Sequence, residues 1–566
     1  MNYRLVAKYL GHFLLALGLL MIPSAGWAVY FAEWRVLKAF VGSIGLSTAA
    51  GAGLAYWGKA AGGRLFQREA LGLVGVSWLV AAALGALPYV FAGVLGPVDA
   101  YFECMSGFTT TGSTVLTDIE GTYKGILFWR SFTHWLGGMG IIVLFIAVLP
   151  YLGAGGKMLF RSESPGPDPR GLRPRIQDTA FILYVLYGGF TVLETIALML
   201  AGMDLYDALC HTFGTLATGG FSTRQASIGA FDSVAVDLII IFFMICAGGN
   251  FALYFAVLRR KWRAPWRDTE WRVYIGLLLI GTAAVTLNLM GVQHHSAIED
   301  SACEVSGAMR KLTPAQRSAV EEVEAVYDSE IATLEAALGS PDEPGGAEGR
   351  AEALRERLAV LRAGRAEAWT AAANTRPYAS FPEALHHAAF QVVSIMTTTG
   401  YCTADSDTWP YFSRMLLMIF MFIGASAGST GGGIKVVRVI MLVKMAYRRL
   451  EHMFRPRTIR AIRISGQVIE DDTQQTVYAF FVLYVLWFAG GALFMSLLGL
   501  PFQTAATSVA ATLNNIGPGL EAVGATMDYH LVPTVGKLFL ALCMALGRLE
   551  LFSILVLFAP AFWRKN

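Results

Sequence analysis

The segment SGFTTTGST, residues 106–114, resembles three later segments of the same chain. These are TLATGGFST (215–223), IMTTTGYCT (395–403) and TLNNIGPGL (512–520). Each one follows an apolar stretch of roughly 10–15 residues, which is too short to cross a membrane but suits a helix that enters it and turns back. The chain therefore contains a short loop that is repeated four times.

One glycine aligns the four loops, and the intervals between the aligned glycines are nearly equal once a polar stretch, 299–378, is set aside. Each loop also lies between two longer apolar runs. We therefore expect a unit of helix, loop and helix that occurs four times, with an insertion in the third copy. The aligned tripeptides are Thr110-Thr111-Gly112, Ala217-Thr218-Gly219, Thr398-Thr399-Gly400 and Asn515-Ile516-Gly517.

The composition places these repeats in a membrane. Hydrophobic residues make up 55% of the 566 residues and charged residues only 15%, whereas soluble domains carry roughly 25% charged residues. The net charge of +3 gives no indication of a nucleic-acid partner. A spanning helix needs about 20 apolar residues. The chain contains ten such runs, near 9–31, 36–57, 70–95, 124–150, 179–201, 233–258, 272–291, 411–445, 474–499 and 533–560.

The positions of the basic residues predict the orientation. More than half of the 44 Lys and Arg residues fall in the segments that are cytoplasmic if the N-terminus is inside. Runs such as Arg259-Arg260-Lys261 flank the ends of the spans. Because cytoplasmic loops of membrane proteins carry an excess of Lys and Arg, we expect both termini in the cytoplasm and all four loops on the outer side.

Such loops suit a site for a cation. Non-helical backbone at membrane depth leaves carbonyl groups unpaired, and each unpaired group costs several kcal/mol. A cation that sheds its water can satisfy those oxygens, and glycine lets successive carbonyls turn toward one axis. The short helices would also point their partly negative C-termini at the ion. We therefore predict a pseudo-fourfold carbonyl filter for a monovalent cation.

The second span of the third repeat is expected to contain a loop inside the membrane. The apolar run 411–445 is too long for one straight crossing and includes a stretch rich in Gly and Ser. Each Gly costs a helix about 1 kcal/mol relative to Ala, so this stretch forms either a loop under the filter or a flexible kink. Its central residues are Gly428, Ser429, Thr430, Gly431, Gly432 and Gly433.

Arg548 lies near the middle of the last span. A central Arg costs at least about 2.5–3.5 kcal/mol on insertion scales, so its side chain should face protein or a water-filled cavity. It either pairs with Glu550 or a helix-end carbonyl, or it faces the pore. Several histidines lie at the starts of helices or loops without metal-ligand spacing, and we expect them to be hydrogen-bonded. They are His134, His211, His386 and His387.

The insertion 299–378 has a different character. Proline at the first turn predicts a helix that starts at Thr313-Pro314. Apolar residues then recur at three- and four-residue intervals before and after a Gly- and Pro-rich turn, so we expect an antiparallel helical hairpin outside the membrane. Because the insertion has more acidic than basic residues, it either concentrates cations near the pore mouth or is an accessory module.

The repeats resemble the Trk/Ktr/HKT superfamily of potassium transporters, and specifically its bacterial TrkH type. The resemblance covers nearly the whole chain except 299–378, and the two extra N-terminal helices are similar to the TrkH form and not to the shorter KtrB form. The residues that carry it are the four loops with their flanks, His134-Trp135-Leu136-Gly137-Gly138-Met139-Gly140 and Gly428-Ser429-Thr430-Gly431-Gly432-Gly433-Ile434-Lys435.

This resemblance implies roles for the loop residues. Backbone carbonyls of the residue pairs before Gly112, Gly219, Gly400 and Gly517 would coordinate K⁺. Gly112 favours potassium, because a serine at this position accompanies sodium transport in some plant relatives. The resemblance also implies that residues 428–433 are an intramembrane gate and that Arg548 is a pore charge that impedes cations until the gate rearranges.

The resemblance further implies a homodimer in the bacterial inner membrane, surrounded by lipid, and a cytoplasmic nucleotide-binding partner, a TrkA-like regulatory subunit of the RCK type. The chain itself has no nucleotide-binding motif in a suitable strand–helix context, and we expect none to bind. Flux through a channel and symport with H⁺ or Na⁺ both remain open.

Two other functions predict different sequence features. A secondary transporter for a small organic solute predicts inverted repeats with broken helices at the midplane, whereas these repeats are parallel with all loops on one side. An enzyme is not expected, because no Ser/His/Asp, H-E-x-x-H or paired-carboxylate motif occurs within the spans. The predicted all-α organisation is two N-terminal helices (1–69), repeat 1 (70–158), repeat 2 (179–261), repeat 3 (272–445), a cytoplasmic linker (446–473) and repeat 4 (474–566).

Overall fold

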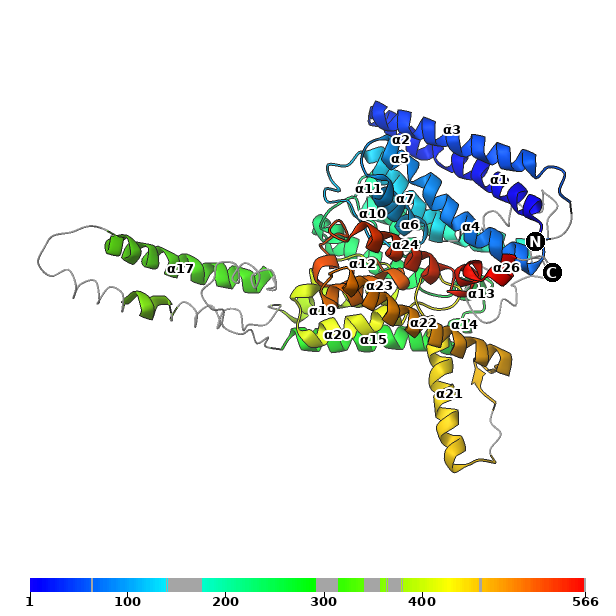
Figure 1. Ribbon diagram of the computed structural model, residues 1–566. Helices are drawn as coiled ribbons and strands as arrows, with labels where there is room; N and C mark the ends of the chain where they lie inside the picture. The colour runs from blue at the N-terminus through cyan, green and yellow to red at the C-terminus, as the bar shows by residue number, and fades with distance from the viewer. Residues whose placement is uncertain are drawn as a thin grey trace, which may run out of the picture. The chain divides into compact units, whose positions relative to one another are not determined.

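The computed structural model describes residues 1–62, 65–138, 140, 176–291, 314–339, 357–362, 364, 378, 380–457 and 461–563. Within these residues the chain is almost entirely helical (Figure 1). The only strands in this part of the chain are a two-residue antiparallel pair, β1 (Arg463–Ile464) and β2 (Gln467–Val468). The expected all-helical class is confirmed.

The chain begins with a helical hairpin made of α1 (Tyr3–Leu20), α2 (Ile22–Tyr30) and α3 (Trp34–Trp57). Glycines allow α1 and α3 to pack closely, because a Cβ atom on Gly11 would lie 2.6 Å from the carbonyl oxygen of Gly51. Figure 1 shows α1 and α3 side by side along most of their length. Small residues at such contacts are typical of helices that pack within a membrane.

Four groups of helices follow, each with a first helix of 19 to 27 residues, a short helix and a further helix of 12 to 15 residues. Their short helices are 12 to 16 residues long, too short to span. The first group contains α4 (Gln67–Gly85), α5 (Leu87–Phe91), α6 (Pro97–Phe108) and α7 (Lys124–Gly138). The second contains α10 (Ile176–Leu200), α11 (Leu205–Leu216), η2 (Ser227–Phe231), α12 (Val234–Ala247), α13 (Phe251–Leu258) and α14 (Ala264–Arg267).

The third and fourth groups follow the same order. The third contains α15 (Thr269–Leu289), α17 (Pro314–Gly339), α19 (Phe381–Met396), η3 (Ser406–Thr408), α20 (Tyr411–Phe422) and α21 (Val436–Phe454). The fourth contains α22 (Asp471–Leu497), α23 (Phe502–Leu513), η4 (Glu521–Val523), α24 (Thr534–Arg548), α25 (Phe552–Leu555), η5 (Val556–Phe558) and α26 (Pro560–Trp563).

The helical segments that follow the short helices are interrupted in the second, third and fourth groups. α12 and α13 meet at 96° after Gly248 and Gly249, and α24 meets the segment from Phe552 to Phe558 at 119°. In the third group, residues 423–435 separate α20 from α21. The residues at the breaks include Glu550 and Leu551, whose φ angles are +56° and +60°. The expectation of an interrupted span in the third group is confirmed, and the same interruption occurs in the second and fourth.

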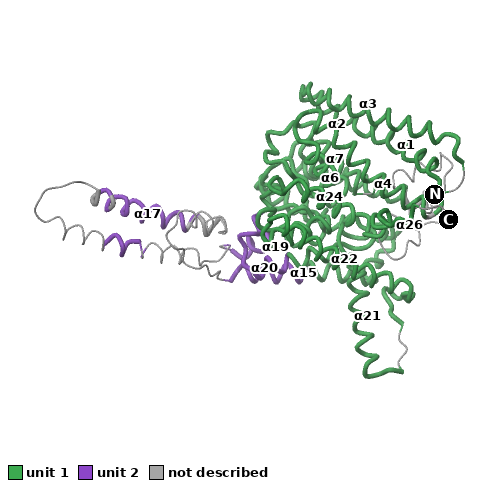
Figure 2. The backbone as a smooth tube through the Cα atoms, viewed as in Figure 1, with its two compact units in different colours: residues 1–278, 390–403, 418–566 green, residues 279–389, 404–417 purple. Residues whose placement is uncertain are grey.

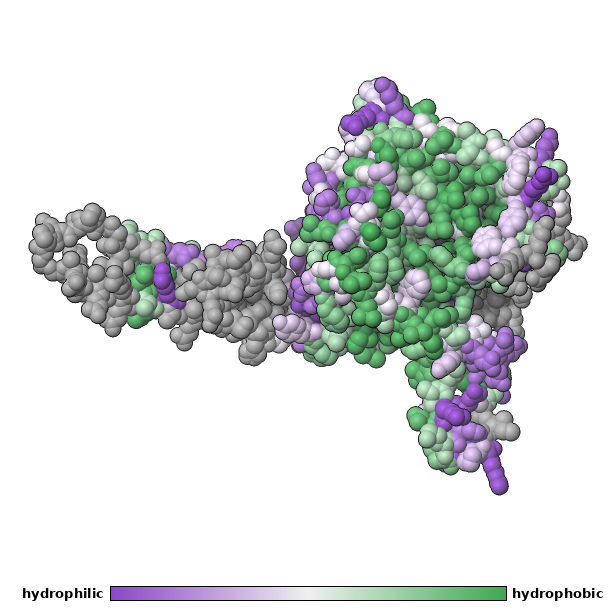
Figure 3. Space-filling model, viewed as in Figure 1, coloured by the Kyte–Doolittle hydropathy of each residue, from purple (hydrophilic) through white to green (hydrophobic). Residues whose placement is uncertain are grey.

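In the part of the chain that the structure describes, six helices are long and apolar enough to cross a membrane, or up to eight if each bent pair is one span. The sequence predicted ten spans. α20 is apolar but short, and most of the segment after α7 in the predicted span 124–150 lies outside the described residues. Figure 3 shows apolar residues across much of the visible face of the helical bundle, as expected where helices face hydrocarbon.

The contacts within the chain divide it into two compact parts, named unit 1 and unit 2 in Figure 2, which differ from the four repeated groups of helices. Unit 1 comprises residues 1–278, 390–403 and 418–566, and it contains all four loops. Unit 2 comprises 279–389 and 404–417 and includes the insertion. α17 begins at Pro314 as predicted. The returning arm of the predicted hairpin lies mostly outside the described residues.

Candidate functional site

The four short helices end in the same turn. After α6, the N–H of Thr110 donates to the carbonyl of Gly107 at 3.1 Å and the N–H of Thr111 to that of Ser106 at 2.8 Å. This pair of hydrogen bonds is a Schellman motif, which satisfies carbonyl groups at the end of a helix. The same pair occurs after the other short helices, at Thr218 and Gly219, at Thr398 and Thr399, and at Asn515 and Ile516.

The turn requires a left-handed residue, which is usually glycine or asparagine. Here the φ angles are +54° for Thr110, +55° for Thr218, +61° for Thr398 and +54° for Asn515. Positive φ is a genuine outlier for β-branched threonine, and such conformations persist where the surroundings determine them, often at functional sites. Three of the four loops therefore carry backbone strain at the same position.

A glycine with positive φ follows two residues after each strained residue. These glycines are Gly112, Gly220, Gly400 and Gly517, with φ from +78° to +103°. The predicted alignment of the second loop is therefore wrong by one residue. Thr218-Gly219-Gly220 has the conformation of Thr110-Thr111-Gly112. Ala217 is instead the C-cap of α11, and the carbonyl of Ala217 accepts a hydrogen bond of 2.6 Å from the hydroxyl of Thr218.

The four loops contact one another in cyclic order. A Cβ atom on Gly112 would lie 2.0 Å from the carbonyl oxygen of Gly219, which belongs to the second loop. A Cβ atom on Gly220 would meet the carbonyl oxygen of Thr399 in the third loop, and one on Gly400 would meet that of Ile516 in the fourth loop. A Cβ atom on Gly517 would meet the carbonyl oxygen of Thr111 in the first loop. Only a residue without a side chain fits at these contacts.

Carbonyl groups at this centre lack hydrogen-bond donors. Each loop offers three in succession, from the strained residue to the glycine. Among the described residues, no group donates to any of these oxygens except that of Gly517. Most buried carbonyl groups in proteins are hydrogen-bonded, so eleven unpaired oxygens in one ring of loops call for a ligand. The strained residues and those that follow them are buried.

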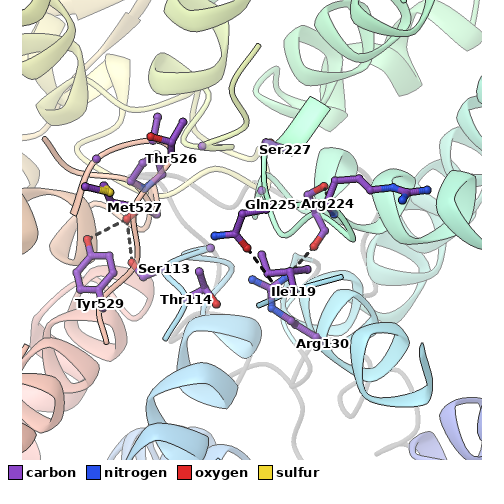
Figure 4. Close-up of a pocket in the computed structure, with 18 residues that line it drawn as sticks. Ser113, Thr114, Ile119, Arg130, Arg224, Gln225, Ser227, Thr526, Met527 and Tyr529 are labelled. Carbon is purple, nitrogen blue, oxygen red and sulfur yellow. Dashed lines mark hydrogen bonds between the residues drawn. The ribbon is translucent and has the colours of Figure 1, made fainter. Parts of the chain in front are cut away.

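The glycines of all four loops line a pocket that contains about 520 Å³ of empty space, including open solvent (Figure 4). Arg130 reaches this pocket from α7, but its charge is neutralised. Its Nε lies 2.6 Å from Oε1 of Glu103, with the two side chains 2% and 0% exposed. Arg130 also donates to the carbonyl of Ser222 at 2.8 Å. The buried ion pair therefore braces the outer end of the second loop.

Side chains fix the loops from behind. The hydroxyl of Tyr401 donates to the carbonyls of His211 and Phe221, at 3.1 and 3.2 Å, and so ties the third loop to the second. His211 is hydrogen-bonded as expected. His134 is not: its ring stacks on Phe221 at 4.0 Å, and among the described residues neither of its nitrogens has a hydrogen-bond partner. The expectation for His134 was wrong.

Residues 423–435, which we call the inner loop, lie against the ends of the short helices of the second, third and fourth repeats. Thr430 donates its hydroxyl to the carbonyl of Leu216 at 2.9 Å, and the N–H of Gly432 donates to the hydroxyl of Thr398 at 2.7 Å. A Cβ atom on Gly432 would lie 2.4 Å from the carbonyl oxygen of Asn514. The inner loop therefore touches elements of the second, third and fourth repeats.

Arg548 completes the contacts. Its Nη1 donates to the carbonyl of Thr430 at 2.7 Å and to the hydroxyl of Thr110 at 3.1 Å. Its Nη2 donates to the carbonyl of Gly138 at 2.9 Å and also to that of Gly137. The structure thus brings Arg548 and the predicted gate residues together directly against the loops. Among the described residues Glu550 pairs with Arg438, whereas the bonds of Arg548 to Gly137 and Gly138 at the end of α7 match the expected pairing with a helix-end carbonyl. The pore-facing role of Arg548 stays a prediction.

Four charged residues in and around the inner loop were not singled out for this role from the sequence. Oε1 of Glu270 accepts hydrogen bonds from the N–H groups of Ala427 at 2.8 Å and Val437 at 3.0 Å. Lys435 donates to carbonyls within the loop. The ion pair of Arg438 and Glu550 joins α21 to the break after α24. No local pattern marks these contacts, because they join residues that are distant in the sequence.

The apolar helices and the loops between them define a multi-pass membrane protein built around converging main-chain segments. A family model described as a cation transport protein, TrkH, matches residues 38–292 and 368–565. The chain is 35% identical over 569 residues to the Trk system potassium uptake protein TrkH of Halomonas elongata and 34% identical over 570 residues to that of Escherichia coli. Both alignments cover the whole of each chain.

A solved structure agrees with this assignment. The crystal structure of the potassium transporter TrkH from Vibrio parahaemolyticus superimposes with a TM-score of 0.76 at 30% identity, and all of both chains are covered. The chain belongs to the TrkH family of cation transport proteins, a transporter family and not an enzyme family. The resemblance expected from the sequence is confirmed.

Proposed function

We propose that this protein takes up potassium ions across the bacterial inner membrane through a filter formed by the four loops in pseudo-fourfold arrangement. The observation that carries the proposal is the set of eleven main-chain oxygens that no described residue satisfies. Oxygens of this kind replace the water shell of a cation. The names of the similar proteins, which are potassium uptake proteins, support potassium as the ion.

The filter residues in this proposal are Thr110 to Gly112, Thr218 to Gly220, Thr398 to Gly400 and Asn515 to Gly517. The C-termini of α6, α11, α19 and α23, which immediately precede them, add partial negative charge. Both features favour a cation over an anion. The glycines that face the pocket are the outermost residues of the filter.

The inner loop and Arg548 form the gate in this proposal. The Arg548 guanidinium lies against the first filter loop and the inner loop. A positive charge there opposes the passage of a cation, and the inner loop occupies the space next to the ends of the short helices. Passage therefore requires that both move, and residues Gly428 to Gly433 have the conformational freedom to do so.

We further propose that the protein works as a homodimer with both termini in the cytoplasm, and that a cytoplasmic nucleotide-binding subunit of the RCK type regulates it. The names of the relatives, which refer to a Trk system, support additional components. The basic cytoplasmic residues around α21 are a suitable docking region for such a partner.

Flux measurements in proteoliposomes test the proposed function. The protein, with its regulatory partner, should carry K⁺ and Rb⁺ well and Na⁺ and Li⁺ poorly. Dissipating an imposed pH or Na⁺ gradient would leave the K⁺ flux of a channel unchanged and would reduce that of a symporter. Equal flux of all four ions would refute the filter, and transport of an organic solute without K⁺ would support the alternative function.

A further inference from the structure

The carbonyl of Gly517 differs from the other carbonyls of the four loops. Oγ of Ser113 donates a hydrogen bond to it at 2.9 Å, and the hydroxyl of Tyr529 donates a second at 3.0 Å. Figure 4 shows the two side chains pointing at one oxygen. No described residue donates to the equivalent oxygens of Gly112, Gly220 and Gly400. The asymmetry is therefore confined to the fourth loop.

The two donors are firmly held. Ser113 and Tyr529 are each only 2% exposed. The N–H of Tyr529 donates to the carbonyl of Thr114 at 2.8 Å, and the Tyr529 ring packs against Phe102 with centroids 5.5 Å apart. Because the main chain and the ring are both fixed, the hydroxyl of Tyr529 has a defined direction toward Gly517.

Burial shows the same difference. Gly112, Gly220 and Gly400 are half-buried beside the pocket, whereas Gly517 is buried and the following Pro518 is half-buried in its place. A carbonyl oxygen has two lone pairs, and both are used when two hydroxyl groups donate to it. The oxygen of Gly517 is therefore a poor ligand for an ion that approaches from the pocket.

We infer that the outermost ion position has three protein ligands, the carbonyls of Gly112, Gly220 and Gly400, and that Ser113 and Tyr529 are positioning residues that withhold the fourth. The inference rests on the proposed function. The number of coordinating carbonyls influences how strongly a filter position binds. A position with three carbonyls and water from the pocket binds K⁺ more weakly, so ions enter the filter without being trapped at its mouth.

The test combines Ser113→Ala and Tyr529→Phe, singly and together, in proteoliposome flux assays. Tyr529→Phe keeps the ring against Phe102 and removes only the hydroxyl. In the double variant the Gly517 carbonyl is released, and the KM for K⁺ should fall about fivefold, the factor expected for one net hydrogen bond, while the maximal rate also falls. Tyr123→Phe, on an exposed loop residue, is the control and should change neither.

A KM that is unchanged or raised in the double variant would overturn the inference while leaving K⁺ uptake by the wild type intact. A merely structural role would lower the flux of K⁺ and Rb⁺ together at unchanged KM. As a second measurement, Rb⁺ density in a crystal of the wild type should have three carbonyl ligands at the level of these glycines, and a Rb⁺ bound to the Gly517 oxygen overturns it. Wild-type vesicles without K⁺ flux would instead reject the proposed function, and the inference with it.

Discussion

The guanidinium of Arg548 donates a hydrogen bond of 3.1 Å to the hydroxyl of Thr110 and so joins the end of α24 to the first of the four loops. The same Nη1 atom donates to the carbonyl of Thr430 in the inner loop. One side chain therefore links the strained residue Thr110 to the inner loop. In the proposed function its positive charge lies where a cation leaving the filter would pass.

Removing this charge should raise the flux of potassium. Two like unit charges about 12 Å apart repel by ~1.4 kcal/mol at an effective dielectric constant of 20, which is a factor of about ten, so Arg548→Ala should increase K⁺ flux roughly tenfold in proteoliposomes. Arg548→Lys keeps the charge and should stay near the wild-type rate. Arg35→Ala, on an exposed residue of α3, is the control. Equal rates for the Ala and Lys variants would show that charge is not the barrier.

Serine at the outer glycines should weaken discrimination between ions. In Gly112→Ser and Gly220→Ser, the new Cβ would meet carbonyl oxygens of the next loop at 2.0 Å, so the ring must widen. The flux ratio of K⁺ to Na⁺ should fall by about tenfold in both variants. Gly202→Ser provides a matched control, since its φ is +105° but nothing lies within 4 Å of the added Cβ. If Gly220→Ser left the flux ratio of K⁺ to Na⁺ unchanged, this would argue against aligning Gly220 with Gly112.

The side chain of Glu270 should keep the inner loop in place. Glu270→Ala leaves the N–H groups of Ala427 and Val437 without their acceptor, and each unsatisfied group costs about 1–3 kcal/mol. The variant should leak K⁺ in the absence of the regulatory subunit. Glu270→Gln retains an acceptor oxygen and should leak much less. The control variant Asp472→Ala, at an exposed position of α22, should leak no more K⁺ than the wild type. A Glu270→Ala variant that does not leak K⁺ would contradict the role of Glu270 in holding the inner loop.

The buried pair of Glu103 and Arg130 should matter for stability. Arg130→Met leaves the Glu103 carboxylate buried without its charged partner, and breaking such a pair costs about 3–5 kcal/mol. Thermal unfolding of the purified protein should occur at a clearly lower temperature. In the double variant Glu103→Leu with Arg130→Met no charge is left behind, so most of that loss should be recovered. A double variant as unstable as the single one would show that the hydrogen bonds of the two side chains, to Ser222, Thr114 and Val115, and not the unpaired charge, account for the loss.

Potassium itself should stabilise the fold if it satisfies the unpaired oxygens. A ligand at 100 times its dissociation constant adds about 2.7 kcal/mol to the free energy of unfolding. The unfolding temperature of the protein should therefore rise with K⁺ and Rb⁺ concentration at constant ionic strength, and N-methylglucamine should have no effect. The Gly112→Ser variant should respond less to K⁺. An identical response to every cation would show that only ionic strength acts.

The sequence predicted the helical class, the loops and the broken span in the third repeat because each leaves a local pattern. Short apolar runs that end at Thr and Gly mark the loops, and Pro314 marks the start of α17. The alignment of the second loop failed at Gly219-Gly220, because two adjacent glycines permit two alignments. Only the φ angle of +78° at Gly220, and the bonds that set it, distinguish them.

The contacts around the site were beyond the sequence for a different reason. Tyr529 reaches Gly517 within one repeat, but Ser113 reaches the same oxygen from another, and Glu270 acts on the inner loop from α15. These partners come together only when the four repeats meet. The nitrogens of His134, which no described residue hydrogen-bonds, were likewise unexpected, because the stacking of its ring on Phe221 and its position beside Gly219 depend on contacts between repeats.

The breaks after α12, α20 and α24 separate the helical segments on their two sides. In the proposed function, a regulatory subunit that moves α21 would therefore act first on the inner loop, while the four loops keep the contacts with one another that set their spacing.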